Sequence, residues 1–152
     1  MRFSLLAWPV ILKKGTFSDA ASWIPADFNP NNTILLIETH PRNTNQNTKM
    51  IDWLEKNYPY QYEVVDRSVI QNKTGKYSDT KIYQFGVLWE FKMTQVTKTD
   101  NKGKMSFSTN YDLFGNFIDR STNKTYPTTN KRNVYGQDGY MPFFHSILNK
   151  FK

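Results

Sequence analysis

Glu38, His40 and Arg42 occupy alternate positions directly after the apolar run TILLI at residues 33–37. A carboxylate two residues from an imidazole forms a pair that can transfer protons, so one hypothesis is a small hydrolase that uses Glu38 and His40. Arg42 lies in the loop at residues 41–45 that enters the helix, and this loop could hold a small anion through its caps. The alternative is that these polar residues and the His40–Pro41 step only end a strand.

The place of these residues in the expected fold makes them candidate binding residues. Residues 33–38 have the length and composition of a buried strand, and residues 45–57 have apolar side chains at helical spacing. Open α/β sheets bind ligands at the carboxyl ends of parallel strands, where helix N-termini offer unpaired N–H groups. This argument is an analogy of fold and names no substrate.

A second candidate set combines basic side chains with tyrosines in the last third of the chain. Proteins that bind single-stranded nucleic acid use this mixture to hold phosphates and stack bases. The alternative is a solvated loop, because the sequence has no RNP-type motif. The set comprises Arg120, Lys124, Tyr126, Lys131, Arg132 and Tyr135.

Several classes of chemistry have no motif in this sequence. The chain has no cysteine, which excludes disulfides, thiol catalysis and cysteine-bound metals. The sequence contains no G-x-S-x-G elbow, no G-x-G-x-x-G fingerprint and no P-loop. Its two histidines lie far apart, whereas zinc ligands are closely spaced. We therefore expect neither a metal site nor a cofactor.

The formal net charge of +7 is concentrated at the two ends of the chain. Residues 1–14 hold three basic and no acidic residues, and residues 100–152 hold eight basic and four acidic ones. Such a surplus can attract anionic partners, including nucleic acid. It is also typical of solvated surface lysines, because no dense basic run occurs.

Residues 1–17 allow two interpretations. Arg2 followed by the apolar residues Leu5–Leu12 resembles part of an export segment, and Pro9 also suits an edge strand. The run is far shorter than the roughly 20 residues that span a bilayer, so we expect no transmembrane segment. The export-like character slightly favours an envelope, periplasmic or secreted protein over a cytoplasmic one.

The first half of the chain predicts a β-α-β unit. Strands at residues 33–38 and 61–66 flank the helix at residues 45–57, so the two strands should be parallel. We also expect a short helical turn from Asp66 to Ile70.

The second half predicts antiparallel strands. From Tyr83 to Met93 and from Met105 to Leu113, large or β-branched side chains occupy every second position, which is the period of half-buried strands. The odd-numbered residues should face the core. Asp100–Gly103 suits a hairpin turn, and further hairpins are expected at Gly115–Asn116 and at Ser121–Lys124. A helix at residues 138–151 should cover the aromatic face of the sheet.

Together these patterns predict one domain over residues 1–152, an α+β two-layer sandwich with a mixed sheet. A doubly wound nucleotide-binding fold is less consistent with the antiparallel second half. The function that we expect is a non-enzymatic accessory or binding domain of the bacterial envelope, or a secreted one, with a protein or an anionic ligand as partner. Nucleic-acid binding and the Glu38/His40 hydrolase are the alternatives.

Overall fold

The computed structural model describes residues 23–128 and 138–152, and it contains one mixed sheet with the strand order β2-β1-β3-β4-β5. Strand β1 spans Leu35–Glu38, β2 Tyr62–Val65, β3 Phe85–Thr99, β4 Met105–Asp119 and β5 Lys124–Pro127. The helices are α2 at Thr44–Asn57, α3 at Arg67–Asn72 and α4 at Tyr140–Lys150, and a 3-10 turn spans Gly75–Ser78. The predicted α+β class is confirmed. The single-domain prediction stays a prediction, because residues 1–17 lie outside the described residues.

The β-α-β unit forms as the sequence predicts. Strands β1 and β2 are parallel, with Leu35 opposite Tyr62, and α2 connects them. The Asn43 side chain caps α2 by accepting a hydrogen bond from the Gln46 N–H at 2.9 Å. All four residues of β1 are buried, because it lies between β2 and β3 and both of its faces are covered.

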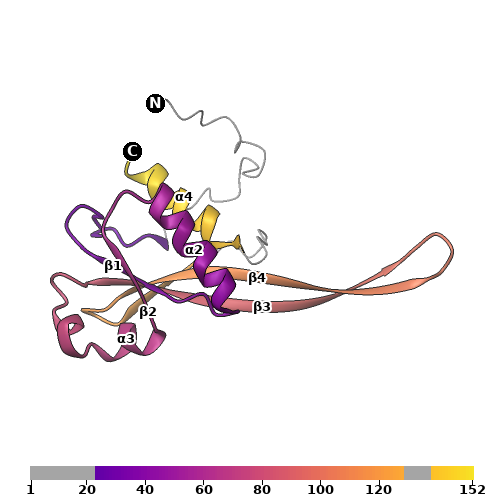
Figure 1. The fold of residues 1–152 in the computed structure, drawn as a ribbon, viewed down its shortest axis with the longest axis horizontal. Coiled ribbons are helices and arrows are strands. Elements are labelled where there is room, and N and C mark those ends of the chain that lie inside the picture. Colours follow the sequence, from indigo (N-terminus) through magenta and orange to yellow (C-terminus); the bar gives the residue numbers. More distant parts are fainter. Residues whose placement is uncertain (1–22, 129–137) are drawn as a thin grey trace.

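Helices α2 and α4 lie together on one face of the sheet (Figure 1). The odd-numbered residues of β1 and β3 point to this face, where Ile37, Val87 and Trp89 join the aromatic residues Phe143 and Phe144 of α4 in one core cluster. The opposite face near β1 carries a smaller cluster of Leu36, Ile70, Tyr83 and Leu88, with Ile70 supplied by α3. The sheet is therefore covered chiefly by α2 and α4.

The hairpin of β3 and β4 extends far beyond the rest of the described structure, which we call the body (Figure 1). Each strand has 15 residues, and the ladder is continuous from Phe85–Asp119 to Thr99–Met105. The predicted turn is confirmed: the Gly103 N–H bonds to the Asp100 carbonyl at 3.0 Å, and Gly103 has a φ of +79°. Half of the hairpin projects into solvent.

The burial predicted from the period of two is confirmed only next to the body. Tyr83, Phe85, Val87 and Trp89 are buried, and Phe91 and Tyr111 are half-buried. The prediction is wrong further out, where the other odd-numbered residues are exposed because no described element covers them: Met93, Met105, Phe107 and Thr109.

The hairpin predicted at Gly115–Asn116 is also wrong, because β4 continues to Asp119. The turn at Ser121–Lys124 is confirmed, and it leads into β5, which pairs with the end of β4. Within the described residues, no helix is long and apolar enough to cross a membrane.

Candidate functional site

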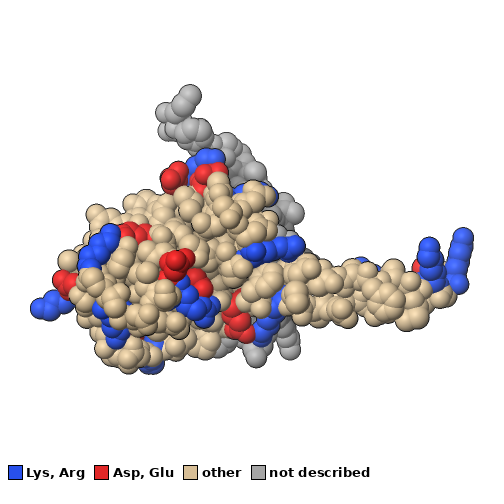
Figure 2. Space-filling model, turned by 60° about the horizontal axis from the view of Figure 1, so that its bottom comes forward, with Lys and Arg blue, Asp and Glu red and all other residues tan. Residues whose placement is uncertain are grey.

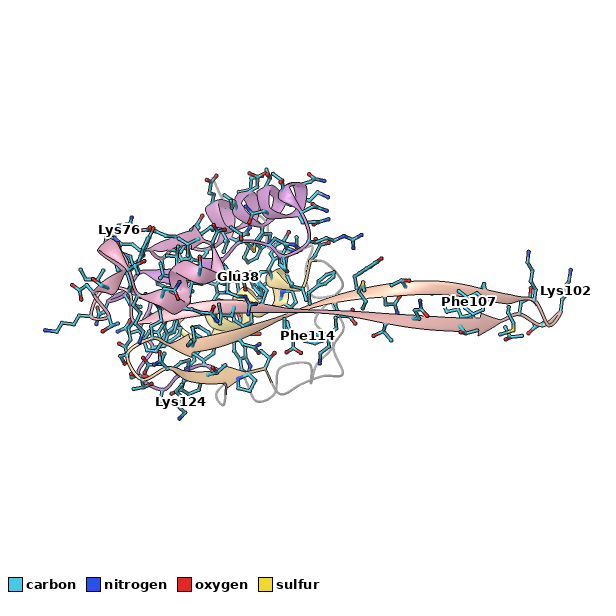
Figure 3. The ribbon with its side chains drawn as sticks, turned by 90° about the horizontal axis from the view of Figure 1, so that it is seen from below. Glu38, Lys76, Lys102, Phe107, Phe114 and Lys124 are labelled. Atoms are coloured by element: carbon cyan, nitrogen blue, oxygen red, sulfur yellow. The ribbon has the colours of Figure 1, made fainter. Side chains whose placement is uncertain are left out.

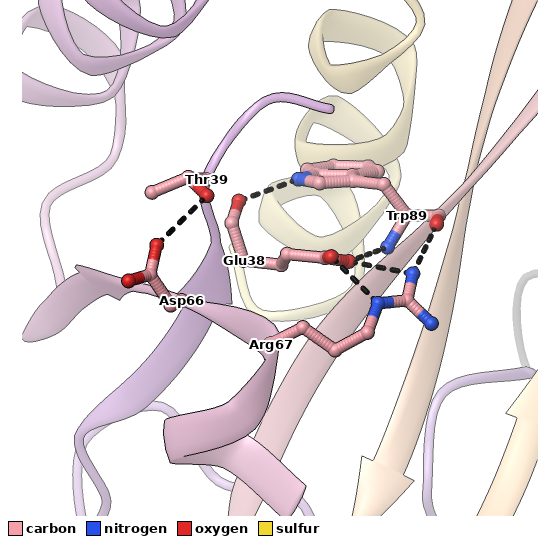
Figure 4. A network of polar contacts seen from close by, with 5 residues as sticks. All are labelled: Glu38, Thr39, Asp66, Arg67 and Trp89. Atoms are coloured by element: carbon pink, nitrogen blue, oxygen red, sulfur yellow. Dashed lines mark hydrogen bonds and ion pairs between the residues drawn. The ribbon is translucent and has the colours of Figure 1, made fainter. Parts of the chain in front are cut away.

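Glu38 is held at the end of β1 by contacts within its own chain. The residue is 7 % exposed, and its carboxylate forms a two-pronged ion pair with Arg67, Nε to Oε1 at 2.7 Å and Nη2 to Oε2 at 2.9 Å (Figure 4). Charge-assisted pairs of this geometry are strong and directional. Both oxygens of the predicted acid–base residue are therefore occupied.

The same ion pair continues the sheet by means of side chains. Backbone pairing of β1 with β3 ends at Ile37 and Val87. One step further, the Trp89 N–H donates to Glu38 Oε2 at 2.7 Å, and Arg67 Nη2 donates to the Trp89 carbonyl at 2.6 Å (Figure 4). The outward backbone groups of Trp89 are thus satisfied at the point where β3 leaves the body.

His40 and Arg42 take different roles. His40 is 5 % exposed, and its Nδ1 accepts a hydrogen bond from the Arg42 N–H at 3.2 Å. The exposed Arg42 guanidinium lies 4.1 Å from the centre of the Tyr111 ring, which in turn stacks on Phe91 with centroids 5.7 Å apart. Arg42 therefore belongs to the place where the hairpin leaves the body, and not to a pocket shared with Glu38.

The second candidate set is divided by the fold. Arg120 is fully buried and donates to the carbonyls of Ile70, Tyr83 and Tyr77, and burial lowers the pKa of its guanidinium. Lys124 lies on β5 with its Nζ 4.6 Å from the Tyr126 ring centre. Lys131, Arg132 and Tyr135 lie outside the described residues, so their role stays a prediction.

The feature that sequence reasoning missed is the projecting part of the hairpin, residues 92–111, which we call the arm. Figure 2 shows it as a slender projection, with basic side chains gathered at its end. Its odd-numbered face carries three large apolar side chains, and Figure 3 shows Phe107 on the outer half of the arm and Lys102 at the tip. The exposed fractions are 68 % for Met93, 57 % for Met105 and 74 % for Phe107.

The distribution of charge on the arm is uneven. Residues 93–97 and 105–111 contain no charged side chain, whereas Lys98, Lys102 and Lys104 surround the turn. Asp100 at the turn accepts hydrogen bonds from the N–H groups of Lys102 and Lys104, at 2.8 and 2.9 Å. The arm thus has an uncharged shaft and a basic tip with an ordered turn.

The edges of the arm are the second unusual property. In the described part of the chain, β1 pairs with β3 only at Gly86 and Val87, and β5 pairs with β4 only from Asn116 onward. Beyond those points each strand pairs with the other alone. Exposed edges of this kind are templates for pairing with a further strand.

The comparisons with known proteins add no functional information. No family model matches the sequence, and no curated protein is significantly similar to it. Among the described residues, no group of three or more histidines and acidic side chains could hold a metal ion. The arm is the candidate site that its exposed apolar side chains and unpaired edges set apart in the described structure.

Proposed function

We propose that this chain is a binding domain that contacts another polypeptide with its arm. One observation carries the proposal: the arm exposes Met93, Met105 and Phe107 on one face, at the end of strands much longer than the core uses. In an isolated protein, exposed apolar side chains and unpaired strand edges favour aggregation. A partner that covers the arm would bury the side chains and pair the edge.

Charge supports a polypeptide partner over nucleic acid. From Lys92 to Lys98 the shaft runs about 20 Å without a charge, at roughly 3.4 Å per residue. Over that length a DNA duplex presents a phosphate about every 1.7 Å. A groove-bound arm would leave most of these phosphates without a cation, because only Lys92 at its base and the three lysines of the tip would contribute.

The hydrolase hypothesis has less support, because the Glu38 carboxylate is held by Arg67 and the Trp89 N–H. The envelope or secreted location stays a prediction, because it depends on residues 1–17. Fractionation of the native host tests it, and recovery of the chain only from cytosol would contradict it.

The arm proposal is tested by site-specific photo-crosslinking in the native host. A photoreactive phenylalanine analogue replaces Phe107 in one variant and Ile82 in a matched control, since Ile82 is an exposed apolar residue of the body with 45 % of its surface accessible. We expect a discrete protein adduct from position 107 and none from position 82. No adduct at position 107, or equal adducts at both positions, would contradict the proposal.

A salt titration tests the nucleic-acid alternative. Because phosphate contacts strengthen as salt falls, binding to single- or double-stranded DNA at low salt, weakened at high salt, would favour that alternative. We expect at most weak binding that does not depend on Phe107.

A further inference from the structure

We propose that the arm pairs with the arm of a second copy of this chain, β4 against β4, across a two-fold axis at Ser108. This inference rests on the proposed function, since it names the polypeptide that the arm contacts. The result would be a four-stranded ribbon in which the two bodies lie at opposite ends.

The two edges of the arm differ in how well they resist strand addition. On β3, the groups of Trp89 are capped by Glu38 and Arg67, and Lys92 and Lys98 bracket the rest of the exposed edge. Natural edge strands use such lysines to prevent pairing. On β4, residues 105–111 have no charged side chain and no proline. Residues 93–97 of β3 are also uncharged, but that stretch has five residues and the one on β4 has seven. In the described part of the chain, β4 therefore offers the longer uncharged edge to a further strand.

The body limits how far the open edge of β4 extends. A Cβ atom at Gly139 would lie 2.2 Å from the Leu113 carbonyl oxygen, so the backbone before α4 already occupies the edge at that residue. At the other end, the strand begins at Met105, directly after the turn. A symmetric pairing that uses the whole of residues 105–111 has its centre at Ser108.

This register makes β4 complementary to a second copy of itself. With Ser108 opposite Ser108, Met105 lies opposite Tyr111 and Phe107 opposite Thr109, so the exposed apolar side chains of both arms share one face. Lys104 lies at the level of Asp112 at each end of the ladder, but Asp112 is 4 % exposed and belongs to the body of its own chain, so the contact is confined to the uncharged residues 105–111. Like charges face each other nowhere within this ladder.

These pairs favour a second copy over an unrelated strand. An isologous two-fold contact uses the same surface on both partners, and it closes after two chains. The contact is small, so we expect a weak dimer, populated at about 100 µM and largely dissociated at about 1 µM.

The absence of cysteine permits a direct test of the register. In the proposed dimer, the two Ser108 Cα atoms lie about 4.5–5.5 Å apart, within the range that a disulfide spans. The two Ser106 Cα atoms are offset by four residues along the strands, or about 14 Å, which a disulfide cannot bridge. Both serines are exposed, so neither Ser108→Cys nor Ser106→Cys should disturb the fold.

The experiment compares the two variants of the full chain at about 100 µM under mild oxidation, on non-reducing gels. We expect Ser108→Cys to form a covalent dimer at least about tenfold faster than Ser106→Cys. A mixture of Ser106→Cys and Asn110→Cys should also cross-link, because these residues lie opposite each other. Equal rates for the two serine variants, or no dimer from Ser108→Cys, would overturn the proposal.

A charge variant gives an independent measurement. Ser108→Lys places two lysines opposite each other on the axis, whereas Ser106→Lys places one opposite Asn110. Sedimentation should show the dimer lost in the first variant and retained in the second. If Ser108→Cys forms no dimer while position 107 cross-links to a different protein, the self-pairing is wrong and the arm proposal stands. If neither cross-links, both are wrong.

Discussion

Glu38 is the last residue of β1, and its side chain continues the pairing of β1 with β3. The backbone pairing of β1 with β3 ends at Val87. Beside Trp89, the Glu38 carboxylate and the Arg67 guanidinium bond to the Trp89 N–H and carbonyl in place of a strand backbone. The sequence places Glu38 correctly at the end of a buried strand. It could not show that the partner is the backbone of a residue 51 positions later, because that contact depends on how the sheet assembles.

Trp89 anchors the point where the arm begins. It is 2 % exposed, its ring contacts Phe143 and Phe144, and its Nε1 donates to the Glu38 carbonyl at 2.8 Å. We expect Trp89→Ala to lower the free energy of unfolding by about 3–5 kcal/mol, as large-to-small core changes do. Urea unfolding measures this, and a loss below about 1 kcal/mol would place Trp89 outside the core.

His145 should make the stability depend on pH. Burial first, and then the nearby Lys152 charge, lower the pKa of this imidazole from its ordinary value of 6.5. As pH falls below 6.5, the unfolded chain takes up a proton that the folded chain resists, so the folded state loses stability. Melting curves between about pH 5 and 7 should show a smaller loss in His145→Gln than in the parent chain. The same pH dependence in both would contradict this assignment.

At the scale of elements, periodicity predicted which side chains of β3 and β4 share a face, but not which part of that face is buried. A period of two shows which side chains share a face, and the odd-numbered Phe85, Val87 and Trp89 are buried as expected. Leu88 on the other face is also buried, because it packs in the second cluster with Leu36 and Ile70. Phe107 has the same pattern and is 74 % exposed. Whether another element covers a face depends on the length and direction of the hairpin, which local sequence does not encode.

Gly115 was predicted to lie in a hairpin turn, but it lies within β4 and packs against Phe143 of α4. A Cβ at this position would lie 2.4 Å from the Phe143 ring, so glycine allows α4 to approach β4. We expect Gly115→Ala to destabilise the protein by about 1–3 kcal/mol through overpacking. Denaturant unfolding of Gly115→Ala in the Phe143→Leu background supplies the control. A smaller cost there is expected, and an equal cost would contradict a direct contact.

Helix α4 should be indispensable to the fold. It buries Tyr140, Phe143, Phe144 and Ile147 against the sheet and α2, and such side chains stabilise by about 1.5–3 kcal/mol each before ordering costs. Deletion of residues 141–152 should therefore expose the aromatic face and give an aggregating or molten chain. Size-exclusion chromatography and thermal melts measure this. A monomeric truncation with an unchanged cooperative melt would show that another element covers the sheet.

At the scale of the whole molecule, the structure divides into a body that folds and an arm that reaches outward (Figure 1). The β-α-β unit, the turn at Asp100–Gly103 and the C-terminal helix all follow from the sequence. The candidate site does not follow from the sequence. Two of the polar residues that the sequence offered as binding residues, Glu38 and Arg120, instead form ion pairs or hydrogen bonds inside the body. The net charge of +7 locates no site either, since the basic residues that the structure describes are spread over the body and the tip.

The most direct test of the account is to shorten the arm while leaving the body unchanged. Deletion of residues 94–97 and 107–110 removes four opposed pairs, preserves the register and turn, and changes no charged residue. In extracts of the native host supplemented with the chain to about 100 µM, chemical cross-linking should capture the parent chain in a complex and leave the shortened chain alone, with equal melting temperatures for the two. A shortened chain that keeps the same complex would contradict the claim that the arm is the binding element.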